Sequence, residues 1–261
     1  GMAAGWGLWA LGVSYLLQNG TMAVQIERAY RRLELPARSP SAPAADTINW
    51  RAEILPLQFR LAGSYFCGYF IAQAVVPFTL HYHGAETAGQ VGLMLSVFNA
   101  LAAIVASYMY AAAPKYAEYI AHGNAEPLAR IFTKVTLVTL GAGVLAYALV
   151  LVGTYAAEHA ELSISHRLAS AQVVLWMTVI GLVNAYVGSA ATLLRAQKKE
   201  PMLPVSIAVA LGYVLAMASL QNADIELLFM AFAVVQVCIA LPFTILTLRK
   251  SGLLSHQPAT T

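Results

Sequence analysis

Long apolar runs occupy most of this chain, and they restrict its fold more than any other feature. A helix that crosses the hydrocarbon core of a bilayer needs about 20 consecutive apolar residues. Runs of that length recur along the sequence, without the alternation of a transmembrane β-barrel. Charged residues make up only 10% of the chain, whereas a typical soluble domain has about 25%. We therefore predict an all-α fold, a polytopic bundle of transmembrane helices.

About seven spans are expected, and the segments between them are short apart from one. The predicted spans are 4–26, 60–81, 90–112, 134–156, 169–193, 203–220 and 226–248. The long exception, 28–56, contains "LPARSPSAPAADT" and is predicted to be a flexible linker that ends in an interfacial helix. After the third span, Tyr116, Tyr119 and Ile120 are expected on one side of a short amphipathic helix at the membrane surface, which Gly123 ends.

Basic residues are distributed unevenly among the segments that join the spans. All of the 15 Lys and Arg except Arg167 fall in alternate segments, namely those after the first, third, fifth and last spans. Cytoplasmic loops carry an excess of Lys and Arg. We therefore expect a multi-pass membrane protein with its N-terminus outside and its C-terminus in the cytoplasm.

This topology suggests a chain that represents one half of a larger transporter. Bacterial transporters usually begin and end in the cytoplasm, so an odd number of helices would precede this sequence. We expect 1–27 to be the last helix of an otherwise missing N-terminal lobe and 28–56 to be the linker between lobes. A six-helix C-terminal lobe, 57–250, and a cytoplasmic tail, 251–261, would follow.

The second span carries two parallel stripes of small and polar residues. Ser64, Gly68 and Ala72 recur every four residues and form a smooth face that favours close helix packing. Another stripe contains Tyr65, Tyr69 and Gln73. Polar groups within hydrocarbon need a partner or water. These side chains therefore either line a hydrated cavity or hydrogen-bond other helices within a packed bundle.

Polar residues on two other spans extend this pattern. Asn99 lies in the third span, and Asn184 lies in the fifth, which reaches Arg195 at its cytoplasmic end. The middle of every predicted span lacks Lys, Arg, Asp and Glu, which ion-coupled carriers usually place there. The missing mid-membrane lysine also excludes a retinal protein.

No motif in the sequence indicates catalysis. The chain has no Walker A loop, dinucleotide-binding fingerprint or nucleophile elbow, so we expect a protein that is not an enzyme, has no cofactor and binds no nucleic acid. The nearest approach to a metal site is "HYHGAE", with His81, His83 and Glu86. Two histidines in a His-x-His pattern diverge on a helix, and we expect interfacial side chains rather than metal ligands.

Three stretches of the chain resemble a family of bacterial membrane proteins. "WRAEILPLQFRLAGSYFCGYFIAQAVVPFTLHYHGAETAGQVGLMLSVFNAL" is similar to the start of the C-terminal lobe of polysaccharide flippase-like (O-antigen or lipopolysaccharide biosynthesis) proteins. "APKYAEYIAHGNAEPLARIF" and "LLRAQKKEPMLPVS" resemble later cytoplasmic segments of these proteins. The family belongs to the multidrug/oligosaccharidyl-lipid/polysaccharide (MOP) exporter superfamily.

The resemblance implies a protein of the bacterial inner (plasma) membrane with two six-helix lobes that rock around a central cavity. It would export a lipid-linked oligosaccharide, a polyprenyl diphosphate glycan, by alternating access. Membrane lipids and the missing lobe would be its other partners. Related flippases are implied to hold the diphosphate with cations in the cavity. Here the candidates are Arg60 and Arg195, each of which could instead be an anchor to lipid headgroups. The alternatives are a non-transporting scaffold subunit of a polysaccharide assembly complex and a drug/cation antiporter of the same superfamily.

Overall fold

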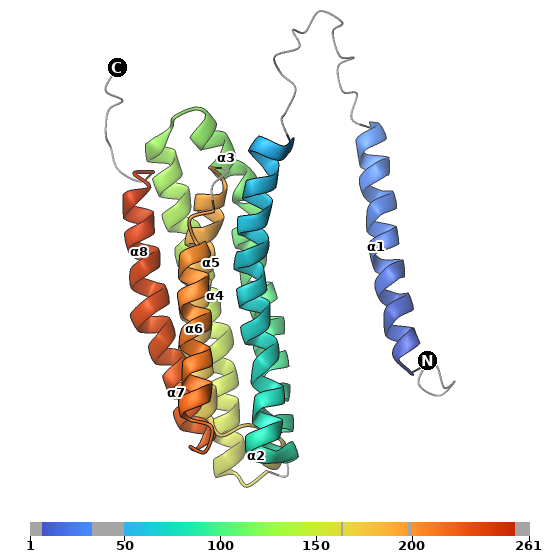
Figure 1. Cartoon of the computed structure of the whole chain (residues 1–261), viewed down its shortest axis with the longest axis vertical. Coiled ribbons are helices and arrows are strands. Elements are labelled where there is room, and N and C mark those ends of the chain that lie inside the picture. The colour runs from blue at the N-terminus through green and yellow to red at the C-terminus, as the bar shows by residue number, and fades with distance from the viewer. Residues whose placement is uncertain (1–6, 33–49, 163, 198–199, 254–261) are drawn as a thin grey trace, which may run out of the picture. The chain divides into compact units, whose positions relative to one another are not determined.

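The computed structural model describes residues 7–32, 50–162, 164–197 and 200–253, and the chain divides into two compact units, Gly1–Ile48 and Asn49–Thr261 (Figure 1). The described part of the first unit is a single helix, α1 (Gly7–Arg32). It continues past the predicted end at 26, where Arg31 and Glu27 form an ion pair of 2.9 Å one helical turn apart. The centre of the predicted linker, 33–49, lies outside the described residues.

The second unit is a helical bundle, and no strand occurs in the described ranges of the chain. The predicted all-helical class is therefore confirmed. Its elements are η3 (Trp50–Ile54), α2 (Leu55–Ala111), α3 (Ala113–Ala121), α4 (Ala125–His159), η4 (Ser165–Arg167), α5 (Ala171–Arg195), α6 (Leu203–Ser219), α7 (Ile225–Val235), η5 (Gln236–Ala240) and α8 (Leu241–Lys250).

The long helix α2 is interrupted at Gly84, whose φ of 86° and ψ of 172° are not helical. Positive φ is accessible to glycine because it has no Cβ. After this residue the chain returns alongside the first half of α2. A Cβ built on Gly92 would lie 3.8 Å from the Val76 side chain. The two predicted spans 60–81 and 90–112 thus correspond to the two halves of α2.

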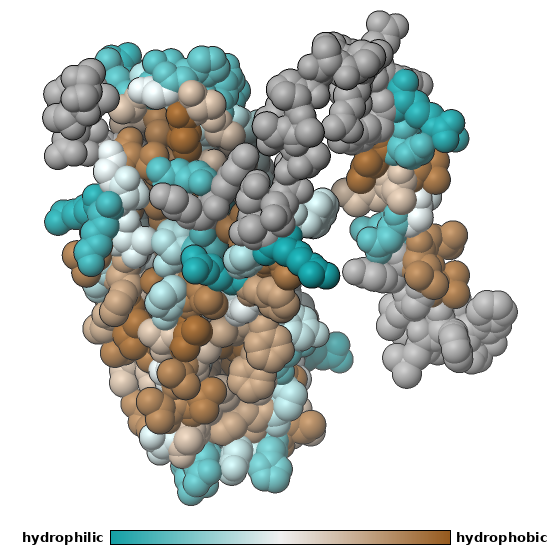
Figure 2. Space-filling view, turned by 45° about the horizontal axis from the view of Figure 1, so that its top comes forward, coloured by the Kyte–Doolittle hydropathy of each residue, from teal (hydrophilic) through white to brown (hydrophobic). Residues whose placement is uncertain are grey.

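Four helical segments among the described residues are long and apolar enough to cross a membrane: Leu55–Ala121, Ala125–His159, Ala171–Arg195 and Ile225–Lys250. The apolar helix α6 is shorter, and α1 does not meet the same limit of hydropathy. Figure 2 shows broad apolar surface on the side of the second unit, with hydrophilic residues gathered towards its ends. These features suggest a membrane protein.

Helix α3 packs against the rest of the bundle. Tyr116 is fully buried, and its ring centroid lies 6.5 Å from that of Phe132 in α4. Tyr119 and Ile120 also pack against the core. The predicted helix and its end at Gly123, where φ is 68°, are confirmed. The apolar side of α3 thus has partners within the chain, and its place at the membrane surface stays a prediction.

Polar contacts tie the bundle together at its two ends. Near the start of α2, the hydroxyls of Ser64 and Ser206 lie 2.8 Å apart and join α2 to α6. At the other end, Gln90 donates a hydrogen bond to the backbone carbonyl of His166. There Ser170 also donates to Glu226, over 2.7 Å. Residues far apart in sequence therefore meet at two separate polar layers, with the apolar helices between them.

Candidate functional site: a polar cleft within the helical bundle

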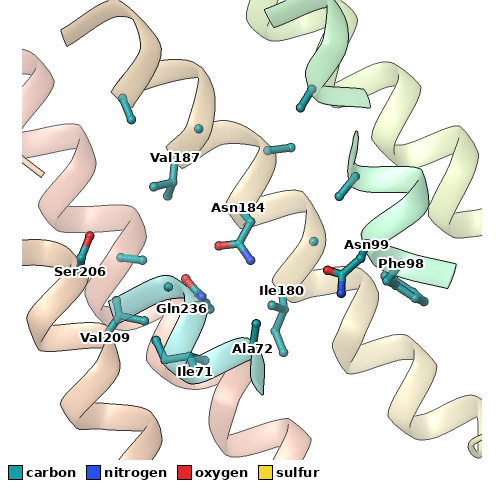
Figure 3. Close-up of a pocket in the computed structure, with 18 of the residues that line it drawn as sticks. Ile71, Ala72, Phe98, Asn99, Ile180, Asn184, Val187, Ser206, Val209 and Gln236 are labelled. Atoms are coloured by element: carbon teal, nitrogen blue, oxygen red, sulfur yellow. The ribbon is translucent and has the colours of Figure 1, made fainter. Parts of the chain in front are cut away.

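An open cleft of about 750 Å³ lies between the helices of the second unit. Its walls come from both halves of α2 and from α4, α5, α6, α7 and η5 (Figure 3). Most of its lining is apolar, which is typical of pockets that bind small molecules through a few placed polar groups. The lining side chains that carry a polar atom are Ser64, Tyr65, Tyr69, Asn99, Tyr110, Thr139, Tyr147, Asn184, Arg195, Ser206, Tyr213 and Gln236.

The face of small residues on α2 packs against another helix at Ser64 and lines the cleft at Gly68 and Ala72. Ser64 is buried against Ser206, and one residue earlier a Cβ on Gly63 would lie 3.1 Å from Leu203. A Cβ on Gly68 would meet no described heavy atom within 4 Å, and Gly68 and Ala72 line the cleft. The structure thus brings Ser64 against α6, whereas no described helix comes within 4 Å of a Cβ on Gly68.

The polar stripe on α2 divides in a similar way. Tyr65 and Tyr69 line the cleft and remain 57% and 66% exposed, because the cleft is open on their side. Gln73 is exposed and lies outside the cleft lining. Arg60 is also exposed and does not line the cleft. Of the two arginines that the sequence suggested, only Arg195 lies at this site.

Asn99 and Asn184 lie at the cleft on neighbouring helices, α2 and α5 (Figure 3). The wall beside them is built by the stacked rings of Phe98 and Tyr147, whose centroids are 5.0 Å apart. A Cβ on Gly181 would lie 2.8 Å from the Tyr147 ring, so glycine at this position makes room for the ring. The two amides are therefore presented from a closely packed wall.

Arg195 is held by a buried carboxylate at the end of α5. Its Nε donates to Glu200 Oε2 over 2.6 Å, and its Nη2 donates to Glu200 Oε1 over 3.2 Å. The Glu200 side chain is fully buried, whereas that of Arg195 is 25% exposed. Arg195 also lies over the Tyr65 ring, 5.0 Å from its centroid, and its Nη1 is 3.5 Å from the Tyr65 hydroxyl. These contacts fix the guanidinium while leaving its Nη1 side towards the cleft.

Three functional candidates were missed by reasoning from the sequence: Glu200, Tyr213 and Gln236. Glu200 belongs to the basic segment "RAQKKEP", which is typical of a loop. Its position five residues after Arg195 was the available signal for an ion pair between the two. Gln236 donates to the Tyr213 hydroxyl over 3.3 Å, and both are buried at the cleft. A glutamine inside an apolar span was the available signal for this pair.

The histidines near Gly84 do not converge on a metal. His81 and His83 remain helical, which directs neighbouring side chains in a His-x-His pattern apart. Within the part of the chain that the structure describes, no group of three His, Cys, Asp or Glu side chains lies close enough to hold a metal ion. Cys67 and Cys238 are free cysteines.

The cleft combines one cation at an end with amides and hydroxyls along its length. Arg195 is the only charged side chain in the described lining. A guanidinium binds phosphate or carboxylate oxygens, whereas amides and hydroxyls both donate and accept hydrogen bonds. Such a site suits an amphipathic ligand with an anionic group and an uncharged polar part. No family model, curated protein or solved structure matches this chain.

Proposed function

We propose that this chain exports a lipid-linked oligosaccharide across the bacterial inner membrane by alternating access, as the C-terminal half of a two-lobe transporter. The observation that carries the proposal is the cleft of about 750 Å³, open on one side and bounded at one end by the Arg195–Glu200 pair. The lipid diphosphate would bind to Arg195, and the glycan would occupy the cleft. The apolar outer surface would face the bilayer.

The arrangement of the bundle ends supports the predicted topology. Tyr65 contacts Arg195, so the start of α2 and the end of α5 share one end of the bundle. The segments near Gln90, His166 and Glu226 meet at the opposite end. Figure 1 shows α3, with Lys115, and the end of α8, with Arg249 and Lys250, at the first end, which favours its assignment to the cytoplasm. The proposed topology has seven spans, with the N-terminus outside.

The open side of the cleft also supports a two-lobe protein. Tyr65, Tyr69, Asn99 and Asn184 are exposed there although they lie on helices with apolar surroundings. Exposing hydroxyl and amide groups to lipid is unfavourable, so water or a second lobe should cover this side. Alternating access requires such a water-filled space between two lobes.

Deletion of the gene tests the proposal. We expect lipid-linked oligosaccharide to accumulate on the cytoplasmic leaflet and surface polysaccharide to disappear, and the full-length gene to restore export. In inverted vesicles, whose outer face is the cytoplasmic leaflet, digestion of a labelled glycan by an added glycosidase reports which leaflet holds the intermediate. Unchanged surface polysaccharide in the deletion strain would overturn the proposal. If variants that remove Arg195 and Asn184 restore polysaccharide fully at normal protein levels, the protein is a scaffold instead.

A further inference from the structure

The cleft contains a second polar centre, built around Gln236, that is separate from the Arg195 end. Gln236 is only 6% exposed, and it belongs to the helical segment Ile225–Lys250, which is apolar enough to span a membrane. Burying a carboxamide in such surroundings costs free energy unless its groups are hydrogen-bonded. Its described hydrogen bond is the one from Nε2 to the Tyr213 hydroxyl. A glutamine amide has a second N–H and a carbonyl oxygen, which leaves further capacity at the cleft.

The backbone around Gln236 explains why this side chain is placed at the cleft. Gln236–Ala240 form a π-helical turn between α7 and α8. Pro242 lies in the first turn of α8 and has no N–H to bond the carbonyl one turn earlier, so the regular helix cannot continue through this point. Short π-helical turns inside α-helices occur frequently at functional sites.

Tyr213, the hydrogen-bond partner of Gln236, is fixed by close packing. Its ring stacks on Phe232, with centroids 4.2 Å apart and planes 5° from parallel. A Cβ on Gly212 would lie 2.8 Å from the Val235 side chain, so glycine permits close approach of α6 and α7 beside this pair. The hydroxyl that receives the Gln236 hydrogen bond is therefore fixed by packing on two helices.

Other uncharged polar groups lie around the same cleft. Figure 3 shows Gln236, Asn184 and Asn99, which come from three different helical segments. Thr139 also lines the cleft, and its buried hydroxyl has no hydrogen-bond partner among the described residues. No carboxylate belongs to the described lining. Groups that both donate and accept, without a charge, match the hydroxyls of a neutral ligand.

We propose that Gln236, Tyr213 and Asn184 form a subsite for the uncharged, hydroxyl-rich part of the ligand, a glycosyl group. Asn184 and Arg195 are on the same helix, separated by about 16 Å at 1.5 Å per residue. The subsite thus lies far enough from Arg195 that one ligand can place an anion at one site and a sugar at the other. This assignment deepens the proposed function and rests on it for the nature of the whole ligand.

Saturation-transfer NMR on the full chain in lipid nanodiscs tests the subsite directly, with methyl glycosides of glucose, galactose and mannose as probes. We expect transfer to at least one glycoside with the wild type. Gln236→Leu should weaken binding of that glycoside about tenfold, because a hydrogen-bonding group is lost at similar side-chain size. The double variant Gln236→Leu/Tyr213→Phe removes both polar groups without leaving either one unsatisfied, and it should show the same loss.

Thr244→Val is the matched control, since Thr244 is fully buried in α8, lies outside the cleft lining and has a hydroxyl without a described partner. This variant should bind glycosides like the wild type. Absence of transfer with the wild type, or equal transfer with Gln236→Leu, overturns the subsite. A parallel titration with polyprenyl diphosphate, which has no sugar, tests the proposed function separately. Gln236→Leu should retain that binding, and a wild type that binds glycoside but no polyprenyl diphosphate would contradict only the proposed function.

Discussion

Arg195 and Arg60 lie towards the same end of the bundle, but their surroundings differ completely. Arg195 is three-quarters buried, shares two hydrogen bonds with the enclosed carboxylate of Glu200 and lies over the ring of Tyr65. Arg60 is exposed on the first turns of α2 and lies outside the cleft. The family resemblance suggested both as contacts for a diphosphate or as anchors to headgroups, and of the two only Arg195 lines the cleft.

The comparison shows that position along a span does not decide the role of a terminal arginine. An exposed arginine at a membrane interface extends its charge to water or headgroups at little cost. A buried arginine must be paired, and its partner then sets its direction. Four experiments test this difference, beginning with the one of largest expected effect.

Glu200→Leu should destabilise the second unit by about 3 kcal/mol, because it leaves the guanidinium of Arg195 without its buried counter-charge. Thermal unfolding in nanodiscs, monitored by size-exclusion chromatography, measures the change in stability. Glu126→Leu is the matched control, since Glu126 pairs with Arg130 on the exposed surface of α4. The control variant should lose only about 0.5 kcal/mol of unfolding free energy. Similar losses for both variants would mean that burial does not distinguish the pairs.

The double variant Arg195→Gln/Glu200→Gln should fold nearly as stably as the wild type, since both charges are removed together. Export should nevertheless fall at least about tenfold, because the bidentate cation at the cleft is gone. Surface polysaccharide per unit of membrane protein, measured in a deletion strain that carries the variant gene, separates the two effects. Normal export by this variant would remove Arg195 from ligand binding.

Tyr65→Leu removes the cation–π contact, and it should lower the interaction free energy between this position and Arg195 by about 1 kcal/mol. Tyr65→Phe keeps the ring and loses only the hydroxyl that lies 3.5 Å from Nη1, and its effect should be smaller. A double-mutant cycle with Arg195→Gln measures the coupling free energy. No coupling in the Tyr65→Leu cycle would show that the ring does not help to position the guanidinium.

Arg60→Gln should have the smallest effect, within about 0.5 kcal/mol of unfolding free energy, as is usual for exposed positions. Export should stay close to that of the wild type, because Arg60 lies outside the cleft lining. The same polysaccharide assay provides the measurement. A loss of export as large as that of the Arg195 double variant would contradict the difference between the two arginines.

Helix positions in the second unit followed closely from the sequence. The predicted spans 169–193, 203–220 and 226–248 correspond to α5, α6 and the continuous segment of α7, η5 and α8. Long apolar runs set these elements, and proline or glycine sets several of their limits. Pro56, for example, lies in the first helical turn of α2, where its missing N–H needs no partner.

The candidate site was only partly visible from the sequence. Polar residues within three predicted spans suggested Tyr65, Tyr69, Asn99 and Asn184, and the family resemblance suggested Arg195. All of these line the cleft, whereas Gln73 and Arg60, which were suggested in the same two ways, do not. Periodicity gives the side of a helix on which a residue lies, and it does not say which neighbouring helix covers that side. Gln73 follows Tyr69 by one turn and still falls outside the cleft for this reason.

What the sequence alone determined is the class of structure: apolar runs without charges require helices whose backbone groups are satisfied internally. What only the tertiary structure decided is which polar groups meet. The pair Gln236–Tyr213 and the contact between Ser64 and Ser206 depend on how separate helices pack. Glu200 is only five residues from Arg195, but its complete burial beside that residue is also a result of the packing. Local patterns constrain each helix separately, whereas the cleft is a property of the space between them.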